Sequence, residues 1–179
     1  LEHYTSSISD WTERSFVLPS HYDTIYIKFI AGQSGWGGHG IVLDNVTIIE
    51  TAVLPALTES FEGEQFPPEG WTHERINGSR DWTRGTGGHD GNPSGAQEGD
   101  FNALFFYDGS DNLSTSLMTP PADVSLMSNP KLTFWHAQAP WYGDINDLAV
   151  YYSDAPDGDW TLLEHYTSSI SDWTERSFV

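Results

Sequence analysis

Residues 147–153 of this 179-residue chain read DLAVYYS, in which the large apolar side chains of Leu148, Val150 and Tyr152 occupy every second position. A period of two residues is the pattern of a β-strand, because successive side chains of a strand point to opposite faces of the sheet. Lys131–Ala137 (KLTFWHA) and Asp159–Tyr166 (DWTLLEHY) alternate in the same way. These three segments predict strands.

Further strand patterns lie on both sides of this region. They are Thr24–Ala31 (TIYIKFIA), Ile41–Ile49 (IVLDNVTII), Trp173–Val179 and its copy Trp11–Val17. The first places Ile25, Ile27 and Phe29 on one face, and the last two alternate with polar residues, as half-exposed strands do. Clusters of Gly, Pro, Asn, Asp and Ser separate the segments, and no 12-residue window shows a helical apolar period. Aromatic residues make up 14% of the chain, which suits the core between two facing sheets. We therefore expect an all-β fold, an antiparallel β-sandwich.

The chain contains one long exact repeat. Residues 1–17 and 163–179 both read LEHYTSSISDWTERSFV, at an offset of 162 residues (163 − 1). Solenoid repeats have periods of about 20–50 residues, so each unit here is expected to be a whole domain of a tandem array. Residues 51–56 follow a predicted strand and contain a proline, as linkers do. We expect residues 1–50 to be the C-terminal part of one repeat unit, 51–56 the inter-repeat linker, and 57–179 the N-terminal part of the next unit.

The composition excludes several classes of partner. The chain has 26 acidic and 7 basic side chains and a formal net charge of −19. Because phosphate binding requires clustered Lys and Arg, we expect no nucleic-acid partner and no docking on an anionic membrane. No apolar run approaches 18 residues, and the opening LEHYTSSISD lacks the pattern of a signal peptide, so we expect no membrane insertion. The absence of cysteine excludes disulfides and cysteine zinc sites.

Five short motifs occur in an order known from one family. They are Ser60-Phe61-Glu62-Gly63 with Pro67-Pro68-Glu69-Gly70-Trp71, then Asn129–Trp135 (NPKLTFW), Asp147–Ser153, Trp173-Thr174, and, in the front part, Tyr26–Phe29 (YIKF) with Gly40–Ile48 (GIVLDNVTI). Together they resemble MAM-like domains, and among these the bacterial cleaved-adhesin (gingipain-type) domains. The resemblance implies a jelly-roll β-sandwich, circularly offset here, from a secreted or cell-surface protein used for adhesion, often with bound calcium. The cysteines of animal MAM domains are missing, and no peptidase region accompanies the motifs.

Calcium is the cofactor that this resemblance implies. A jelly roll places its first and last strands side by side, so we expect Glu62 and Asp44 to converge where the family holds its calcium. Asp100 and Asn102 are the expected third and fourth ligands, because calcium takes six to eight oxygen ligands from carboxylates and carbonyls. The alternative is that Glu62 and Asp44 are strand-end carboxylates that make local hydrogen bonds.

Aromatic residues in Gly- and Pro-containing loops form the predicted ligand-binding surface. They are Trp36, Trp82, Trp141 and Tyr142. An exposed ring stacks on the apolar face of a sugar, and nearby Asp, Asn or His side chains accept or donate hydrogen bonds to its hydroxyls. The alternative is that these rings cap the ends of the core. Trp36 and the Trp141–Tyr142 pair are the strongest candidates for exposure.

Signatures of catalysis are poor. Gly35, Gly37 and Gly40 have the spacing of a dinucleotide-binding loop, but a β-branched strand follows them where that loop requires a helix. The sequence has no Gly-x-Ser-x-Gly, no His-Glu-x-x-His and no phosphate loop. We therefore expect a protein that is not an enzyme.

Two functions of different classes remain. In the first, the unit is a binding module that attaches to an extracellular glycan or protein, and its many copies add avidity to a weak single-site affinity. In the second, the unit is structural. Residues 1–17 and 163–179 compete for one place in a sheet, so one copy either stays loose or pairs with another molecule. In the second case strands exchange with neighbouring repeats or other copies of the chain and build a filament, fibre or stalk.

Overall fold

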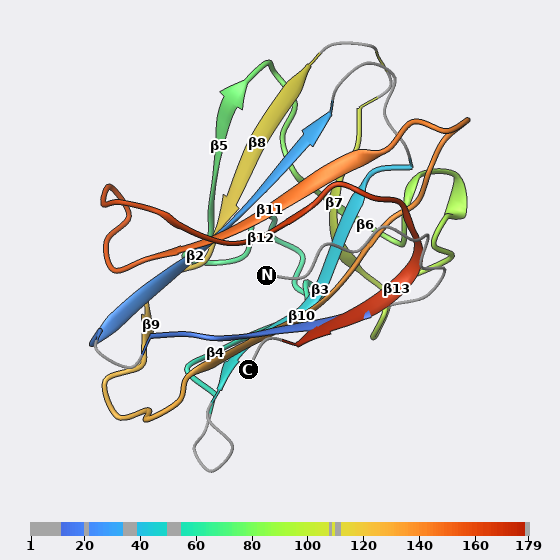
Figure 1. Ribbon diagram of the computed structural model, residues 1–179. Coiled ribbons are helices and arrows are strands. Elements are labelled where there is room, and N and C mark those ends of the chain that lie inside the picture. The colour runs from blue at the N-terminus through green and yellow to red at the C-terminus, as the bar shows by residue number, and fades with distance from the viewer. Residues whose placement is uncertain are drawn as a thin grey trace.

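A computed structural model describes residues 12–19, 22–33, 39–49, 55–107, 109 and 112–177 (Figure 1). Within these residues the chain forms strands and one short 3-10 helix, η1 (His89–Gly91). The strands are β1 (Thr12–Val17), β2 (Thr24–Gln33), β3 (Ile41–Ile49), β4 (Leu57–Glu59), β5 (Thr72–Asn77), β6 (Thr83–Gly85), β7 (Asn102–Phe105), β8 (Leu113–Met118), β9 (Ala122–Asp123), β10 (Lys131–Gln138), β11 (Asn146–Ser153), β12 (Thr161–Tyr166) and β13 (Ile170–Ser177).

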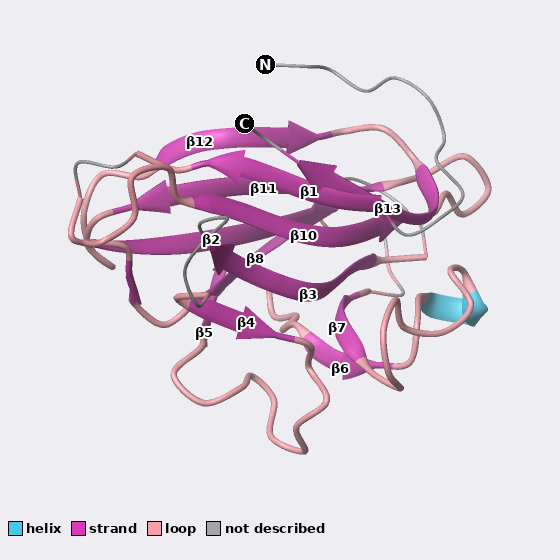
Figure 2. Cartoon of the chain, turned by 90° about the horizontal axis from the view of Figure 1, so that it is seen from below, coloured by secondary structure: helices cyan, strands magenta, loops and turns pink. Residues whose placement is uncertain are grey.

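The strands form two sheets packed face to face (Figures 1 and 2). The 7-stranded sheet has the order β1-β13-β10-β3-β7-β6, with β4 paired to β3, and the 6-stranded sheet has the order β12-β11-β2-β8-β5, with β9 paired to β2. The pairings between described strands are antiparallel, apart from a short parallel contact between β1 and β13. The prediction of an antiparallel β-sandwich is confirmed.

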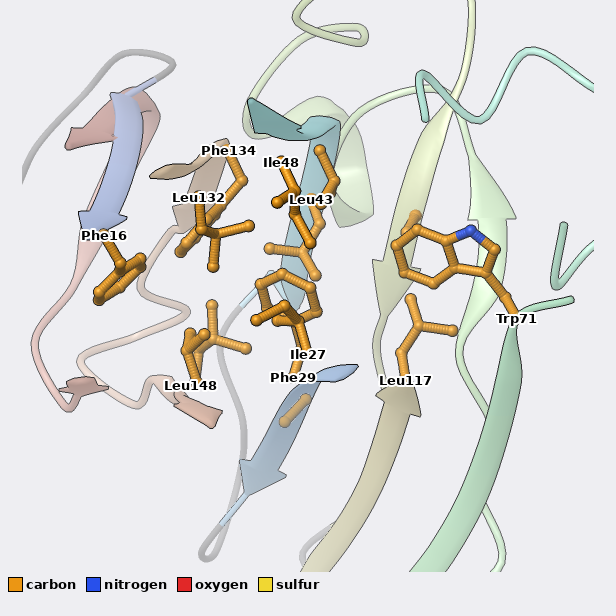
Figure 3. Close-up of a cluster of buried hydrophobic side chains, with 14 of the residues drawn as sticks. Phe16, Ile27, Phe29, Leu43, Ile48, Trp71, Leu117, Leu132, Phe134 and Leu148 are labelled. Atoms are coloured by element: carbon orange, nitrogen blue, oxygen red, sulfur yellow. The ribbon is translucent and has the colours of Figure 1, made fainter. Parts of the chain in front are cut away.

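The core lies between the two sheets and follows the alternation of the central strands. Ile25, Ile27 and Phe29 share one face of β2, as predicted, and all three are fully buried. Figure 3 shows Ile27 and Phe29 among core side chains of the other sheet. The ring of Phe134 on β10 meets Phe29 edge-on at 5.1 Å and stacks on Phe16 of β1 at 5.7 Å. Each such side chain contributes about 1.5–3 kcal/mol by leaving water, so these alternating strands carry much of the stability.

Both copies of the repeated sequence lie along the same strand. β1 and β13 each pair with β10, and Figure 2 shows the two beside it. On its other side β10 pairs with β3, where Lys131 faces Ile49 and Leu132 faces Ile48. The two copies therefore share one edge of one strand.

Several strands escape the sequence pattern because they are short or polar. β5 (Thr72–Asn77) exposes most of its side chains, and β4, β6 and β9 span three residues or fewer. In the part of the chain that is described, no helix is long and apolar enough to cross a membrane.

Candidate functional site

A tight turn at one end of the sandwich presents an exposed tyrosine. Trp141 and Asp144 exchange two backbone hydrogen bonds of 2.9 Å, and Tyr142 (φ 49°) and Gly143 (φ 96°) form the tip. Both central residues have positive φ, which is the geometry of a type I′ turn. Tyr142 is 94% exposed. A bulky residue with positive φ is unusual, so the turn holds this ring outward against the preference of its backbone.

Four other rings stand behind Tyr142. We call the five residues His39, His89, Phe106, Trp141 and Tyr142 the aromatic end cluster. The Trp141 ring meets Tyr142 edge-on at 5.2 Å and His39 edge-on at 4.8 Å. His89 stacks on Phe106 at 3.7 Å and lies 5.8 Å from Trp141. The cluster thus joins four segments that are separate in sequence, at residues 39, 89, 106 and 141–142.

Hydrogen bonds fix the two histidines of this cluster. The backbone N–H of His89 donates to the carbonyl of His39 (2.8 Å), and Nδ1 of His39 donates to the carbonyl of His89 (2.6 Å). The backbone N–H of His39 donates to Ala139 (2.9 Å), which ties the cluster to the end of β10. Asp90 lies with one carboxylate oxygen 3.7 Å from Nε2 of His89. A fixed ring surface beside Asp90 and Asp144 has the chemistry to contact a sugar face and its hydroxyls.

The other two predicted aromatic contacts do not join this surface. Trp82 is 1% exposed, packs against Phe105 at 5.8 Å and donates its indole N–H to the carbonyl of Thr115 (3.0 Å). The expectation of an exposed ring is wrong for Trp82, because the indole packs into the core just before β6 begins at Thr83. Trp36 lies outside the described residues.

The predicted metal ligands Asp44 and Glu62 meet the same loop, at residues 97–101. One oxygen of Asp44 accepts from the backbone N–H groups of Gln97 and Glu98, both at 3.1 Å, and the other accepts from Asn45 (2.7 Å). Asp44 is fully buried. Burial raises the pKa of the Asp44 carboxyl to about 7, and the charge of Glu62 adds to the shift, while the backbone hydrogen bonds act in the opposite direction.

Glu62 holds the far half of this loop. Its Oε1 accepts from the backbone N–H groups of Asp100 (3.0 Å) and Phe101 (2.9 Å). A Cβ on Gly99 would lie 2.4 Å from the same oxygen, and Gly99 has a φ of 65°, so glycine is favoured where the loop crosses Glu62. The local hydrogen bonds foreseen as the alternative to calcium are therefore present at both carboxylates.

The two further expected ligands play other parts in this geometry. Asp100 contributes its backbone N–H to Glu62. The buried side chain of Asn102 accepts from the N–H of Gly87 (2.5 Å) and donates to the carbonyl of Ala103 (3.0 Å). Asn102 thus fastens β7 to the neighbouring loop.

The donor set near Asp44 and Glu62 fits a calcium ion only in part. Among the described residues no three His, Asp or Glu side chains gather as a complete metal site. Each carboxylate oxygen has two lone pairs, however, so one hydrogen bond leaves room for a second partner. A cation here would offset the burial and the charge of Glu62, which both raise the pKa of Asp44, with backbone carbonyls and water supplying the remaining oxygens.

Sequence reasoning missed three residues at these sites. His39 and His89 are neighbours only in the folded protein, where their loops meet at one end of the sandwich. In the sequence both lie in Gly-rich segments that look like ordinary turns. Glu98 accepts a hydrogen bond from the side-chain amide of Asn45 (3.0 Å) and adds a third carboxylate near Asp44. Its position two residues before Asp100, in the same predicted turn, was the available signal.

Comparisons of the chain with models of protein families, with curated proteins and with solved structures find no match.

Proposed function

We propose that this chain is a non-enzymatic attachment module of a secreted or cell-surface tandem-repeat protein, and that it binds an extracellular glycan or protein through the aromatic end cluster. The proposal includes the finer fold assignment, a MAM-like adhesin jelly roll that is circularly offset from its natural repeat unit. The sequence motifs from Ser60 to Trp173 support that assignment, and the antiparallel sandwich agrees with it.

The observation that carries the proposal is the exposure of Tyr142. Folding alone does not explain a 94% exposed ring that is held at positive φ by a hydrogen-bonded turn. Binding residues are often placed on loops fixed by a rigid scaffold, because their geometry is then set before the ligand arrives. Trp141 and His39 supply such a support behind Tyr142.

The experiment compares two exposed side chains. Tyr142→Ala removes the tip of the cluster without removing any core packing, and Leu126→Ala is the matched control, because Leu126 is 88% exposed and lies elsewhere. Arrays of glycans and matrix proteins identify a ligand for the unmodified chain. Loss of a central aromatic contact costs about 2 kcal/mol, so Tyr142→Ala is expected to weaken binding about 30-fold and Leu126→Ala to leave it unchanged. Blank arrays, or equal binding by both variants, would contradict the proposal.

Calcium belongs to the same proposal as a stabilising cofactor. Asp44 and Glu62 would hold the ion, with Glu98 and the loop at residues 97–101 beside them. When bound, the ion would supply positive charge between two carboxylates that otherwise repel each other. At a free concentration 100 times its Kd, a ligand stabilises the folded state by about 2.7 kcal/mol.

Thermal unfolding with and without a chelator tests this assignment. Calcium is expected to raise Tm in the unmodified chain but not in Asp44→Asn or Glu62→Gln. Asp157→Asn is the matched control, because Asp157 is an exposed acid in a turn outside this loop. A Tm that ignores both calcium and chelator would refute the assignment.

A further inference from the structure

The two copies of the repeated sequence occupy one place in the sheet, residue for residue. Thr12 and Thr174, which are equivalent in the repeat, both lie opposite His136, and Arg14 and Arg176 both lie opposite Phe134. The same holds for the equivalent pairs Glu13 and Glu175, opposite Trp135, and Ser15 and Ser177, opposite Thr133. Identical register follows from identical sequence, because side-chain alternation fixes the register of a strand with one buried face.

Backbone chemistry allows one occupant at this place. We call the edge of β10 that faces β1 and β13, residues 131–136, the β10 edge site. A strand has two edges, and β10 uses the other for β3. Each backbone N–H and carbonyl of the remaining edge makes one ladder hydrogen bond, so a second full strand has no ladder partners there.

The side chains lead to the same conclusion. Arg14 and Arg176 are 3% and 1% exposed, and their guanidinium carbons lie 4.9 Å and 5.1 Å from the centre of the same ring, that of Tyr166. Two buried cations at one ring repel each other in a medium that screens charge poorly. One arginine suits the position, and two crowd it.

One buried aromatic side chain from each copy packs against the rest of the protein. Phe16, from the first copy, stacks on Phe134 in the core (Figure 3). Trp173, from the second copy, is 1% exposed on the opposite face of the sheet and donates its indole N–H to the carbonyl of Gly95 (2.9 Å). Each copy contains both a tryptophan and a phenylalanine at these positions, five residues apart. Either copy alone therefore has the two aromatic side chains that the site buries.

We infer that the β10 edge site is an interaction site for a single copy of the repeated segment, and that the surplus copy of one molecule docks into this site on a second molecule of the same chain. The inference goes beyond the proposed attachment function and does not depend on it, because Tyr142 takes no part in the β10 edge site. The contact is β-strand addition, in which main-chain hydrogen bonds give affinity and side-chain pockets give specificity.

The number of strands sets the form of this association. Residues 1–179 contain one β10 edge site and two copies, so within these residues one copy is surplus in separate and in linked molecules alike. When two molecules become linked, each new pairing of a copy with β10 between molecules replaces one such pairing within a molecule, so the number of strand pairs does not change. The strands exchange by mass action, and linked forms grow with concentration. A fibre or stalk built in this way requires a further contact between chains.

A disulfide trap tests the exchange, because the chain has no cysteine of its own. Ser15 and Thr133 lie opposite each other in an antiparallel pair, where Cα atoms are about 4.5–5.5 Å apart and a disulfide can close. Ser15→Cys and Thr133→Cys are made on separate chains, mixed at high concentration and oxidised. We expect a linked species of twice the 20.0 kDa chain mass, joined through residues 15 and 133. Leu126→Cys, on an exposed residue, replaces Ser15→Cys as the collision control. A yield no higher than this control would overturn the inference.

A peptide provides an independent test on the unmodified chain. A fluorescent peptide of sequence LEHYTSSISDWTERSFV is expected to enter the β10 edge site and co-elute with the 20.0 kDa protein in size exclusion. In 100-fold excess the unlabelled peptide is expected to reduce the disulfide trap at least tenfold. The same peptide carrying Phe16→Asp places a charge against Phe134 and is expected to do neither. Failure of the unmodified peptide to bind, or equal binding by both peptides, would overturn the inference.

Discussion

Replacement of Phe16 by alanine is expected to have a much smaller effect than the burial of this ring suggests. Phe16 is 1% exposed and stacks on Phe134 with an angle of 12° between the ring planes. Removing a buried Phe side chain costs about 3–5 kcal/mol in an ordinary core. Here Phe178 repeats Phe16 in the sequence, and the second copy can take over the β10 edge site. Phe178 itself lies outside the described residues.

The magnitude follows from the count of occupants. With two equivalent copies, disabling one removes a factor of two from the folded population, which is about 0.4 kcal/mol by RT ln 2. A change of 1 kcal/mol moves Tm by about 2–4 °C in a domain of this size. Phe16→Ala is therefore expected to lower Tm by less than about 2 °C.

Phe134 provides the matched control, because it lies in the same stack but has no copy in the chain. Phe134→Ala is expected to lose the full 3–5 kcal/mol, a fall of about 6–20 °C in Tm. The double variant Phe16→Ala/Phe178→Ala is expected to approach the same loss. The assay is thermal or urea unfolding followed by tryptophan fluorescence. If Phe16→Ala alone unfolds as early as Phe134→Ala, the two copies are not interchangeable and the reasoning is refuted.

Three further predictions concern the carboxylate loop and the core. Because the folded-state pKa of Asp44 lies near 7, above its unfolded value, the folded state binds more protons, so stability falls as pH rises from about 4 to 7. Asp44→Asn should flatten that part of a plot of unfolding free energy against pH, and an unchanged slope would contradict the shift. Gly99→Ala places a Cβ 2.4 Å from Glu62 at a φ of 65° and should lower Tm by several degrees, whereas a Tm equal to that of the unmodified chain would show that the loop does not cross Glu62 closely. Trp82→Phe removes the donor to the carbonyl of Thr115 and should lower the free energy of unfolding in urea by about 1–3 kcal/mol without any change in ligand binding. A loss of ligand binding with unchanged stability would show instead that Trp82 contacts the ligand.

The sequence predicts the long strands well, because their side chains face a buried layer on at least one side. The predicted Ile41–Ile49 matches β3, and the predicted starts and ends of β2, β10 and β11 differ by two residues at most. Ile25, Ile27 and Phe29 show the two-residue period of a strand, because the buried face of β2 requires an apolar residue at every second position. Short polar strands such as β5 lack this signal, since their stability comes from the neighbouring strand rather than from their own side chains.

The sites are predicted less completely, for a physical reason that differs between them. Asp44 and Glu62 reach one loop, but whether a carboxylate meets a backbone N–H or a cation depends on loop geometry that residue types do not encode. Trp82 and Tyr142 look alike in sequence, as aromatic residues in turns, and differ fully in exposure because Trp82 packs into the core between the sheets and Tyr142 lies at the tip of a turn. The partnership of His39 with His89 is tertiary and spans 50 residues.

The position of β10 along the chain, between the two copies, also affects folding during synthesis. An open strand edge of an incomplete sheet is a template for aggregation until another strand covers it. β1 precedes β10 in the chain, and β13 follows it by more than thirty residues. When β10 leaves the ribosome, the first copy is already present to cover its edge, and the second copy arrives later and competes for the same position. In the growing chain β1 therefore protects the open edge of β10 at first, and it can leave this edge once β11, β12 and β13 have been made.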